Sequence, residues 1–187
     1  MRIIFLLFVL TIATTGCNKT DVCTDVICEN GGFCNSDGFC DCPEGYSGFS
    51  CEVENTPSKM FIESIEITKF PSFEPDGDAW DTFSPEPDLT FEVARENQNS
   101  FYQHSTYFPD AVGSGTYIFD NLSIELTNVG TQRYVIGLFD FDDTSADDFM
   151  GGVVFLPYLS GNGFPEFMDL NPSGGTVAFK VKFRYAF

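Results

Sequence analysis

All seven cysteines of this 187-residue chain lie between Cys17 and Cys51. The last six are separated by four, five, five, one and eight residues. An even set of cysteines in a short segment of an exported chain is typical of a disulfide framework, because so small a unit buries too little apolar surface to fold without cross-links. Six cysteines allow fifteen pairings, and their spacing does not choose among them. The sequence therefore predicts a small disulfide-bonded module, with Cys17 left over.

Residues 1–16 have the features of a secretory signal peptide. Arg2 supplies a positive charge, and the apolar run over 3–10 is too short to cross a bilayer. The next residues, Thr14-Thr15-Gly16-Cys17, resemble the lipobox of bacterial lipoproteins, although that family prefers leucine where Thr14 stands. The resemblance implies acylation at Cys17, which would explain the odd cysteine. The alternative is an ordinary cleavage site followed by an incidental cysteine.

Lipidation at Cys17 has consequences for the location of the chain. It would make 17–22 a lipidated tether and would anchor the protein in the cell membrane or outer membrane. The rest of the chain would face the periplasm or the cell exterior.

Residues 23–51 resemble an epidermal-growth-factor-like (EGF-like) module. The resemblance is carried by the run from Glu29 to Cys34 and by the Cys-x-Cys-x-x-Gly-Tyr-x-Gly pattern that starts at Cys40. It implies three disulfide pairs, Cys23–Cys34, Cys28–Cys40 and Cys42–Cys51. Some EGF-like modules bind Ca²⁺ through acidic residues just before the first cysteine, but a lone Asp21 does not make that pattern, so we expect no metal here. Residues 52–60 are expected to be a linker.

The remaining residues, 61–187, predict an all-β domain. The chain contains 22 phenylalanines, and short aromatic and β-branched runs alternate with Gly, Pro, Asn and Asp. We therefore expect an eight-stranded antiparallel β-sandwich. The expected strands are Phe61–Lys69, Leu89–Arg95, Phe101–Thr106, Tyr117–Phe119, Leu122–Thr127, Arg133–Phe139, Gly152–Leu156 and Thr176–Phe187. The last of these places Lys180, Lys182 and Arg184 on one face, which is typical of a solvated edge strand protected by charge.

The net charge of -19 excludes some classes of partner. Nucleic acid is not an expected ligand, because its binding depends on Lys and Arg that neutralise phosphates. A zinc site built on several histidines is also excluded, since His104 is the only histidine.

Five aspartates crowd the stretch between two apolar runs, from Asp140 to Asp148. Carboxylates this close repel one another, and Ca²⁺, which takes oxygen ligands, relieves that repulsion. Asp140 and Asp142 are two residues apart, so on a strand end they point the same way. The alternative is a solvated acidic turn.

A second acidic stretch runs from Asp76 to Asp88. Together the two stretches resemble the calcium-binding loops of C2 domains, the calcium-dependent phospholipid-binding sandwiches. Those domains place two Asp before one strand and, in a later loop, Asp-x-Asp followed by a further Asp, a hydrophobic residue and Gly. The resemblance covers 61–187 and implies Ca²⁺ as cofactor, held by Asp81, Asp88, Asp140, Asp142 and Asp148. Proline precedes Asp88 here, whereas the family commonly has proline after that aspartate.

These features favour a membrane-anchored lipoprotein that acts as a calcium-dependent binding or adhesion module. Its ligand would be a phospholipid, a glycan or a protein. We expect no enzymatic activity, because the chain has one histidine and no nucleophile motif. Two alternatives remain: a structural surface tether without calcium dependence, and a carboxylate-based glycosidase.

Overall fold

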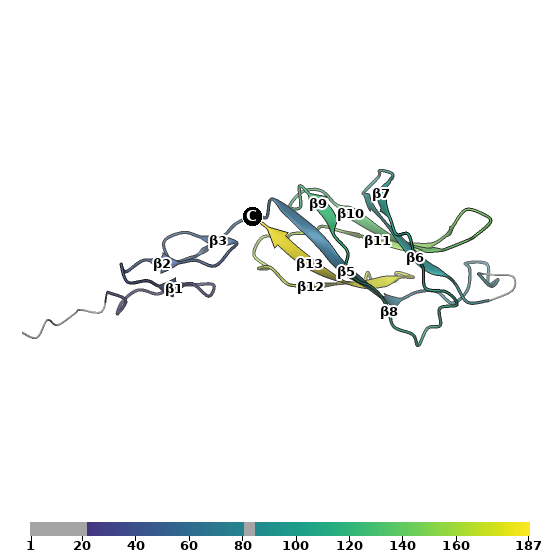
Figure 1. Cartoon of the computed structure of the whole chain (residues 1–187), viewed down its shortest axis with the longest axis horizontal. Helices are drawn as coiled ribbons and strands as arrows, with labels where there is room; N and C mark the ends of the chain where they lie inside the picture. The colour runs from purple at the N-terminus through teal and green to yellow at the C-terminus, as the bar shows by residue number, and fades with distance from the viewer. Residues whose placement is uncertain (1–21, 81–84) are drawn as a thin grey trace, which may run out of the picture.

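The computed structural model describes residues 22–80 and 85–187, and every regular element in these ranges is a β-strand. The chain forms two parts, a small disulfide module (22–56) and a β-sandwich (59–187), which lie end to end (Figure 1). Cys17, Asp81 and residues 1–16, on which several sequence predictions fall, lie outside the described residues. Within the described ranges, no helix has the length and apolar composition needed to cross a lipid bilayer.

The disulfide module consists of two short hairpins joined by three bridges. Its strands are β1 (Phe33–Cys34), β2 (Cys40–Asp41), β3 (Tyr46–Ser47) and β4 (Val53–Glu54), with β1 paired to β2 and β3 to β4. The bridges join Cys23 to Cys34, Cys28 to Cys40 and Cys42 to Cys51, the same pairs that the resemblance implied. Strand β4 and the start of β5 (Lys59–Lys69) lie within 52–60, so regular structure extends into the predicted linker from both sides.

The sandwich has two antiparallel sheets, as the alternating runs predicted. The first has the order β11 (Asp148–Phe155), β10 (Tyr134–Asp140), β6 (Leu89–Arg95), β7 (Ser100–Gln103). The second has the order β12 (Phe167–Leu170), β13 (Ala178–Ala186), β5 (Lys59–Lys69), β8 (Tyr117–Phe119), and β9 (Ile124–Thr127) also pairs with β5. The described sandwich therefore adds one strand, β12, to the eight expected. Strand β12 is only four residues long and has a single buried side chain, Leu170, so its sequence carries little alternation.

The core fills the space between the two sheets. Inward side chains of β5 and β13, such as Ile65 and Val181, face those of β6 and β10, such as Phe91 and Leu138, and all four are fully buried or nearly so. Polar groups at the core edge are paired: the Tyr134 hydroxyl donates to the carbonyl of Thr127 and accepts from its N–H. This packing fixes the strand ends from which the loops emerge.

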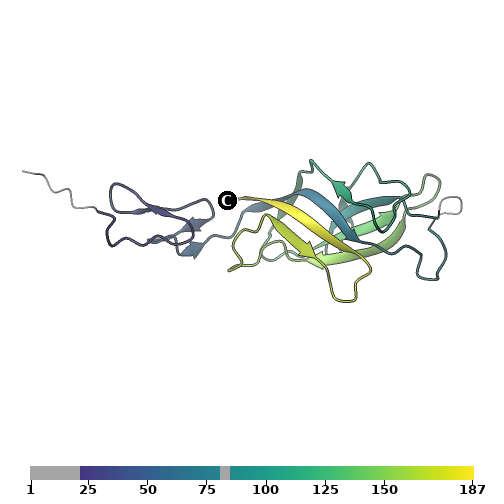
Figure 2. The same cartoon turned by 90° about the horizontal axis from the view of Figure 1, so that it is seen from below.

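The prediction of an edge position for the last strand is wrong. Strand β13 pairs with β12 on one side and with β5 on the other, and Figure 2 shows it running alongside β5. Its basic residues contact neighbouring strands instead of protecting an edge. Lys182 and Arg184 form ion pairs with Glu63 of β5, at 3.4 and 2.9 Å. The sequence pattern was the same for either position, because outward charged residues suit any solvated sheet face.

The disulfide module packs against the sandwich through Glu54 and a group of aromatic rings. One carboxylate oxygen of Glu54 accepts from the Tyr158 hydroxyl (2.7 Å) and from the Gly161 N–H (3.0 Å), and the other accepts from the Gly163 N–H (3.0 Å). Beside them, the Tyr46 ring packs edge-on against Phe164, with 5.2 Å between centroids. The two parts thus share both polar and apolar contacts.

Gly45 allows the close approach at this junction. Its φ of 90° favours glycine, and a Cβ at this position would lie 2.4 Å from the Phe164 ring and 2.7 Å from the Phe187 ring. The Gly-Tyr pair of the sequence pattern therefore places a ring and a bare backbone against the sandwich.

Candidate functional site

The loops at one end of the sandwich carry the two acidic stretches. We call this end, which lies opposite the disulfide module, the distal end (Figures 1 and 2). Its described loops are residues 70–80 and 85–88, 104–116, 141–147 and 171–177, which connect the strands there. They contain no lysine or arginine, and they carry the carboxylates Glu74, Asp76, Asp78, Glu86, Asp88, Asp110, Asp142, Asp143 and Asp147. One ammonium group reaches these loops from the end of β5, where Lys69 donates to the Gly175 carbonyl at 2.6 Å. The nine carboxylates outnumber it, so the distal end is strongly negative.

Asp140 fixes the start of β6 against the end of β10. It is 1% exposed, and one of its carboxylate oxygens accepts a hydrogen bond from the Asp88 N–H. The Phe141 N–H donates in return to the Asp88 carbonyl, at 2.8 Å. Asp140 also lies opposite Asp148 in the β10–β11 ladder. The side chains of three predicted ligands, Asp88, Asp140 and Asp148, therefore extend from backbone positions that lie next to one another.

The loop after β7 runs beside the start of β6 and contributes a carboxylate that the sequence analysis missed. The backbones of Leu89 and Phe108 exchange two hydrogen bonds of 2.9 Å, and the Asp110 N–H donates to the Asp88 carboxylate at 2.9 Å. Asp110 stands alone in its stretch of sequence, so no acidic run marked it. Only the pairing of this loop with β6 brings Asp110 to the site.

A β-bulge at Met150 changes the direction of the strand that leaves the acidic loop. In the β10–β11 ladder, Leu138 pairs with Gly151 but Phe139 pairs with Phe149, so Met150 is the extra residue. The Thr176 hydroxyl donates to the carbonyl of Met150 at 3.2 Å, and a Cβ on Gly151 would lie 2.5 Å from that hydroxyl oxygen. Bulges of this kind re-aim side chains near functional sites, and here the bulge leaves Asp148 and Phe149 exposed.

Burial and repulsion between the loops raise the pKa of two carboxyl groups. Burial, together with the charges of Asp110, Asp143 and Asp142, raises the pKa of Asp88, and the hydrogen bond from the Asp110 N–H opposes that effect only in part. Partial burial and the neighbouring Asp76, Asp148 and Asp78 raise the pKa of Glu74. Charges from different loops therefore act on one another, as a shared cation site would require.

The described residues do not form a closed metal cage. Among residues 22–80 and 85–187, no three His, Cys, Asp or Glu side chains converge closely enough to hold a metal ion. Asp88, Asp140 and Asp148 share the strand ends, whereas Asp142 extends into the loop, where its N–H donates to the Asp147 carboxylate at 3.3 Å. The oxygen donors have the chemistry that Ca²⁺ prefers, but the loops would have to draw together to ligate it.

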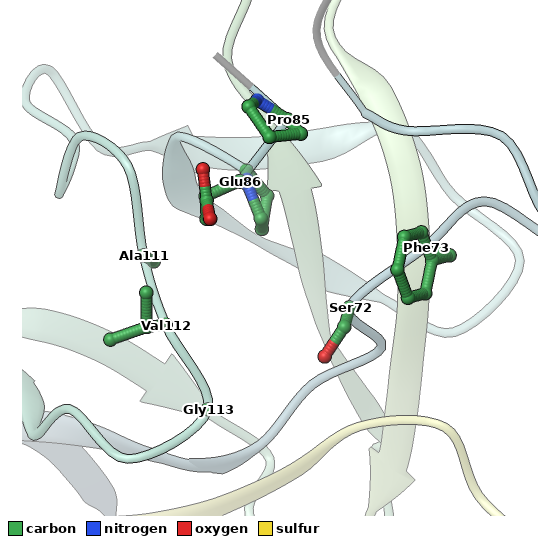
Figure 3. Close-up of a pocket in the computed structure, with 8 residues that line it drawn as sticks. Ser72, Phe73, Pro85, Glu86, Ala111, Val112 and Gly113 are labelled. Atoms are coloured by element: carbon green, nitrogen blue, oxygen red, sulfur yellow. The ribbon is translucent and has the colours of Figure 1, made fainter.

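A cavity of about 330 Å³ opens beside the acidic loops. Figure 3 shows Ser72 and Phe73 on one side of it, Ala111 to Gly113 on the other, and Pro85 and Glu86 between them. Phe73 is 59% exposed and Val112 47% exposed, so apolar surface lies next to the carboxylates. At the base of the same loop, Trp80 is 8% exposed and its indole N–H donates to the Pro71 carbonyl, so this ring belongs to the core.

A first prediction concerns Asp88. Because its pKa is raised in the folded state, the folded protein binds this proton more tightly than the unfolded chain does, and stability falls as the pH rises above the ordinary Asp value of 3.8. Asp88→Asn retains the acceptor for the Asp110 N–H and removes the charge. We expect the variant to melt at a higher temperature than the unmodified protein at pH 7 without calcium, with the difference vanishing below about pH 4. Thermal denaturation across this pH range measures it, and a variant that is less stable at pH 7 would contradict it.

The solved structures to which the chain is similar include C2 domains, whereas no protein-family model and no curated protein matches it. One is the first C2 domain (domain A) of a plant extended synaptotagmin 1, at 10% identity and a TM-score of 0.45, over 71% of this chain and 97% of that one. Another holds C2 domains A and B of extended synaptotagmin 2 (19% identity, TM-score 0.38), with 70% of this chain covering 41% of that chain. A third is C2 domain A of RIM from Drosophila, at 9% identity and a TM-score of 0.30, over 71% of this chain and 100% of the other.

Proposed function

We propose that this protein is an exported lipoprotein whose sandwich binds Ca²⁺ at the distal end and uses the bound ion to attach to a ligand. The observation that carries the proposal is the convergence of carboxylates from separate loops whose described residues include no lysine or arginine. The side chains of Asp88, Asp140 and Asp148 extend from neighbouring backbone positions, and burial together with the charges of nearby aspartates raises the pKa of Asp88. A calcium ion would offset that charge and draw the loops together.

The ligands in this proposal are Asp88, Asp140, Asp142 and Asp148, with Asp81 contributing from outside the described residues. Bound Ca²⁺ would supply a positive centre beside the exposed Phe73 and Val112. Such a surface suits a phospholipid, glycan or protein ligand that carries both a negative and an apolar group. The chain would act as a binding module and would not catalyse a reaction.

The remaining parts of the proposal concern attachment. Cys17 would carry the lipid, and the EGF-like disulfide module would hold the sandwich away from the membrane. The arrangement supports this role, because the distal end lies opposite the disulfide module and therefore points away from the N-terminal side of the chain (Figure 1).

Calcium titration tests the proposal directly. We expect a calorimetric binding isotherm with Ca²⁺ and a higher melting temperature, since a ligand that binds only the native state at a hundredfold above its Kd stabilises it by about 2.7 kcal/mol. Mg²⁺ should do less, because it keeps its water shell. Asp142→Asn should remove most of the effect, whereas Asp169→Asn, which changes an exposed carboxylate on β12, should not.

Two results would favour the alternatives. If millimolar Ca²⁺ gives no calorimetric binding signal and leaves the melting curve unchanged, the acidic loops are solvated turns and the protein is a structural tether. If the protein hydrolyses a glycoside in excess chelator, and that activity is lost on mutation of one carboxylate pair, it is a glycosidase. A screen of phospholipid vesicles and glycans with and without Ca²⁺ then identifies the ligand class.

A further inference from the structure

A second cavity, of about 320 Å³, lies at the open edge of the first sheet near the distal end. Strand β7 is the edge strand there, and the loop that follows it forms one wall. The lining includes Gln103, Ser105, Tyr107, Phe141 and Asp147. None of these residues is a predicted calcium ligand, and the residues of the first cavity do not contribute to it.

Two aromatic rings from different loops form one wall. Tyr107 and Phe141 stack with their centroids 4.4 Å apart and their planes 15° from parallel. Tyr107 is 37% exposed, so part of this stacked pair faces solvent. Aromatic faces attract cations electrostatically, and guanidinium groups also stack on them.

The base of the cavity is held by neutral polar groups. The ring nitrogens of His104 lie 3.0 Å from the Tyr102 hydroxyl and 3.0 Å from the Thr106 hydroxyl. The imidazole stacks on Phe91 at 5.0 Å, and burial lowers the pKa of His104, which keeps it neutral at pH 7. The Thr90 hydroxyl, on a residue 2% exposed, donates to the Thr106 carbonyl at 3.3 Å. The base is therefore ordered and supplies no positive charge.

The charge of the cavity has one sign. Among the described residues that line it, Asp147 is the only acidic one, and none is lysine or arginine. The flanking residues of the same loop, Asp142 and Asp143, are also acidic. A phosphate, sulfate or carboxylate ligand would be repelled. A neutral sugar would make use of the rings but would gain nothing from the negative potential.

We propose that this cavity binds the guanidinium or ammonium group of an organic cation, with the cation against the Tyr107–Phe141 pair and its N–H groups donating to Asp147. A guanidinium fits best, because its planar face stacks on a ring while its edge donates to a carboxylate. The group would come either from an arginine side chain of a partner protein or from a small free amine. The inference goes beyond the proposed function and does not depend on bound calcium.

The test uses the full chain in detergent, in excess chelator, and ligand-observed NMR titrations. The probes are an acetylated Gly-Gly-Arg-Gly-Gly amide, the same peptide with neutral citrulline in place of arginine, and agmatine. We expect the arginine peptide to bind about tenfold more tightly than the citrulline peptide. Agmatine that binds as well as the arginine peptide indicates a small cation as the natural ligand, whereas a markedly tighter peptide indicates a protein segment.

Variants locate the binding. Asp147→Asn and Tyr107→Leu should each weaken the arginine peptide about tenfold. Their controls, Asp169→Asn and Phe167→Leu on β12, change an exposed carboxylate and an exposed ring away from the cavity and should have no effect. Asp147→Asn is nearly isosteric, so it remains informative if Tyr107→Leu does not fold.

Three results would overturn the inference: equal affinities for the arginine and citrulline peptides, tighter binding of methyl glucoside than of the arginine peptide, or binding that Asp147→Asn leaves unchanged. Because the titrations are made without calcium, they succeed or fail independently of the calcium isotherm.

Discussion

Replacing the Cys42–Cys51 bridge with two serines should unfold the second half of the disulfide module and leave the sandwich intact. The bridge ties the loop between β3 and β4 back to Cys42, ahead of β3, with a sequence separation of nine, and Cys51 is fully buried. A native disulfide of a small domain contributes about 2–5 kcal/mol. Cys51 is the only buried hydrophobic residue in the described part of the module, so the module has little other stability with which to offset that loss.

Limited proteolysis and hydrogen exchange measure this effect. We expect new cleavage within 43–50 and faster amide exchange there, while peptides from β5 to β13 keep their protection. The matched control is Ile27→Ser together with Phe49→Ser, which adds two serines to the same module at side chains 80% and 75% exposed. Unchanged exchange in the Cys42→Ser/Cys51→Ser variant would show that the remaining contacts hold the module together.

Glu54→Ala should separate the disulfide module from the sandwich. The carboxylate accepts three hydrogen bonds from the sandwich, from the Tyr158 hydroxyl and the N–H groups of Gly161 and Gly163. Tyr158 is 4% exposed, so its hydroxyl would lose its charged acceptor in a largely buried position. Leaving these three donors without their charged acceptor should destabilise the junction by roughly 2–4 kcal/mol in total. The total is smaller than the sum of three separate losses, because losses at neighbouring sites are not additive. The packing of Tyr46 and Gly45 against the Phe164 ring would then remain.

The direct readout is hydrogen exchange at Gly161 and Gly163, because their amides donate to Glu54. We expect loss of protection in Glu54→Ala, a smaller loss in Glu54→Gln, and none in Glu52→Ala. Glu52 is a close control, since its carboxylate accepts from the Ser50 N–H and hydroxyl within its own turn and does not reach the sandwich. Protection that persists in Glu54→Ala would mean that the aromatic contacts suffice.

The junction should also depend on pH. The hydrogen bond from Tyr158, followed by those from Gly161 and Gly163, lowers the pKa of Glu54 below its ordinary value of 4.5, against the opposing effect of burial. A carboxyl group with a lowered folded pKa stabilises the folded state above its ordinary pKa, and this contribution is lost as the pH falls through the folded value. The amides of Gly161 and Gly163 should therefore lose their extra protection below about pH 4, and Glu54→Ala should show no such change.

Much of the fold could be read from local pattern. The alternation of Leu122, Ile124 and Leu126 and of Phe179, Val181 and Phe183 with polar residues predicts half-buried strands, and all six side chains are buried. The spacing of the cysteines predicted a bridged module, and the residues around them implied its pairs. The local pattern sufficed because side-chain alternation and short closed loops are properties of neighbouring residues.

The position of a strand within its sheet is not a local property. Strand β13 has the same alternation at an edge or in the interior, and only the pairing with both β5 and β12 decides it. The contact of Glu54 with Tyr158 spans a sequence separation of 104, and nothing in the sequence near Glu54 indicates it.

For the candidate sites, too, some features follow from the local sequence and others only from the tertiary structure. The sequence by itself determined that carboxylates are dense in two stretches, because Asp-rich runs between apolar runs must form acidic loops. Only the tertiary structure decided which carboxylates meet: it pairs Asp140 with Asp148, ties Asp140 to the backbone of Asp88, and brings Asp110 beside them. It also stacked Tyr107 on Phe141 across two loops. The physical reason is that strand pairing and bulges set which loop ends are neighbours, and these depend on contacts between residues far apart in the chain.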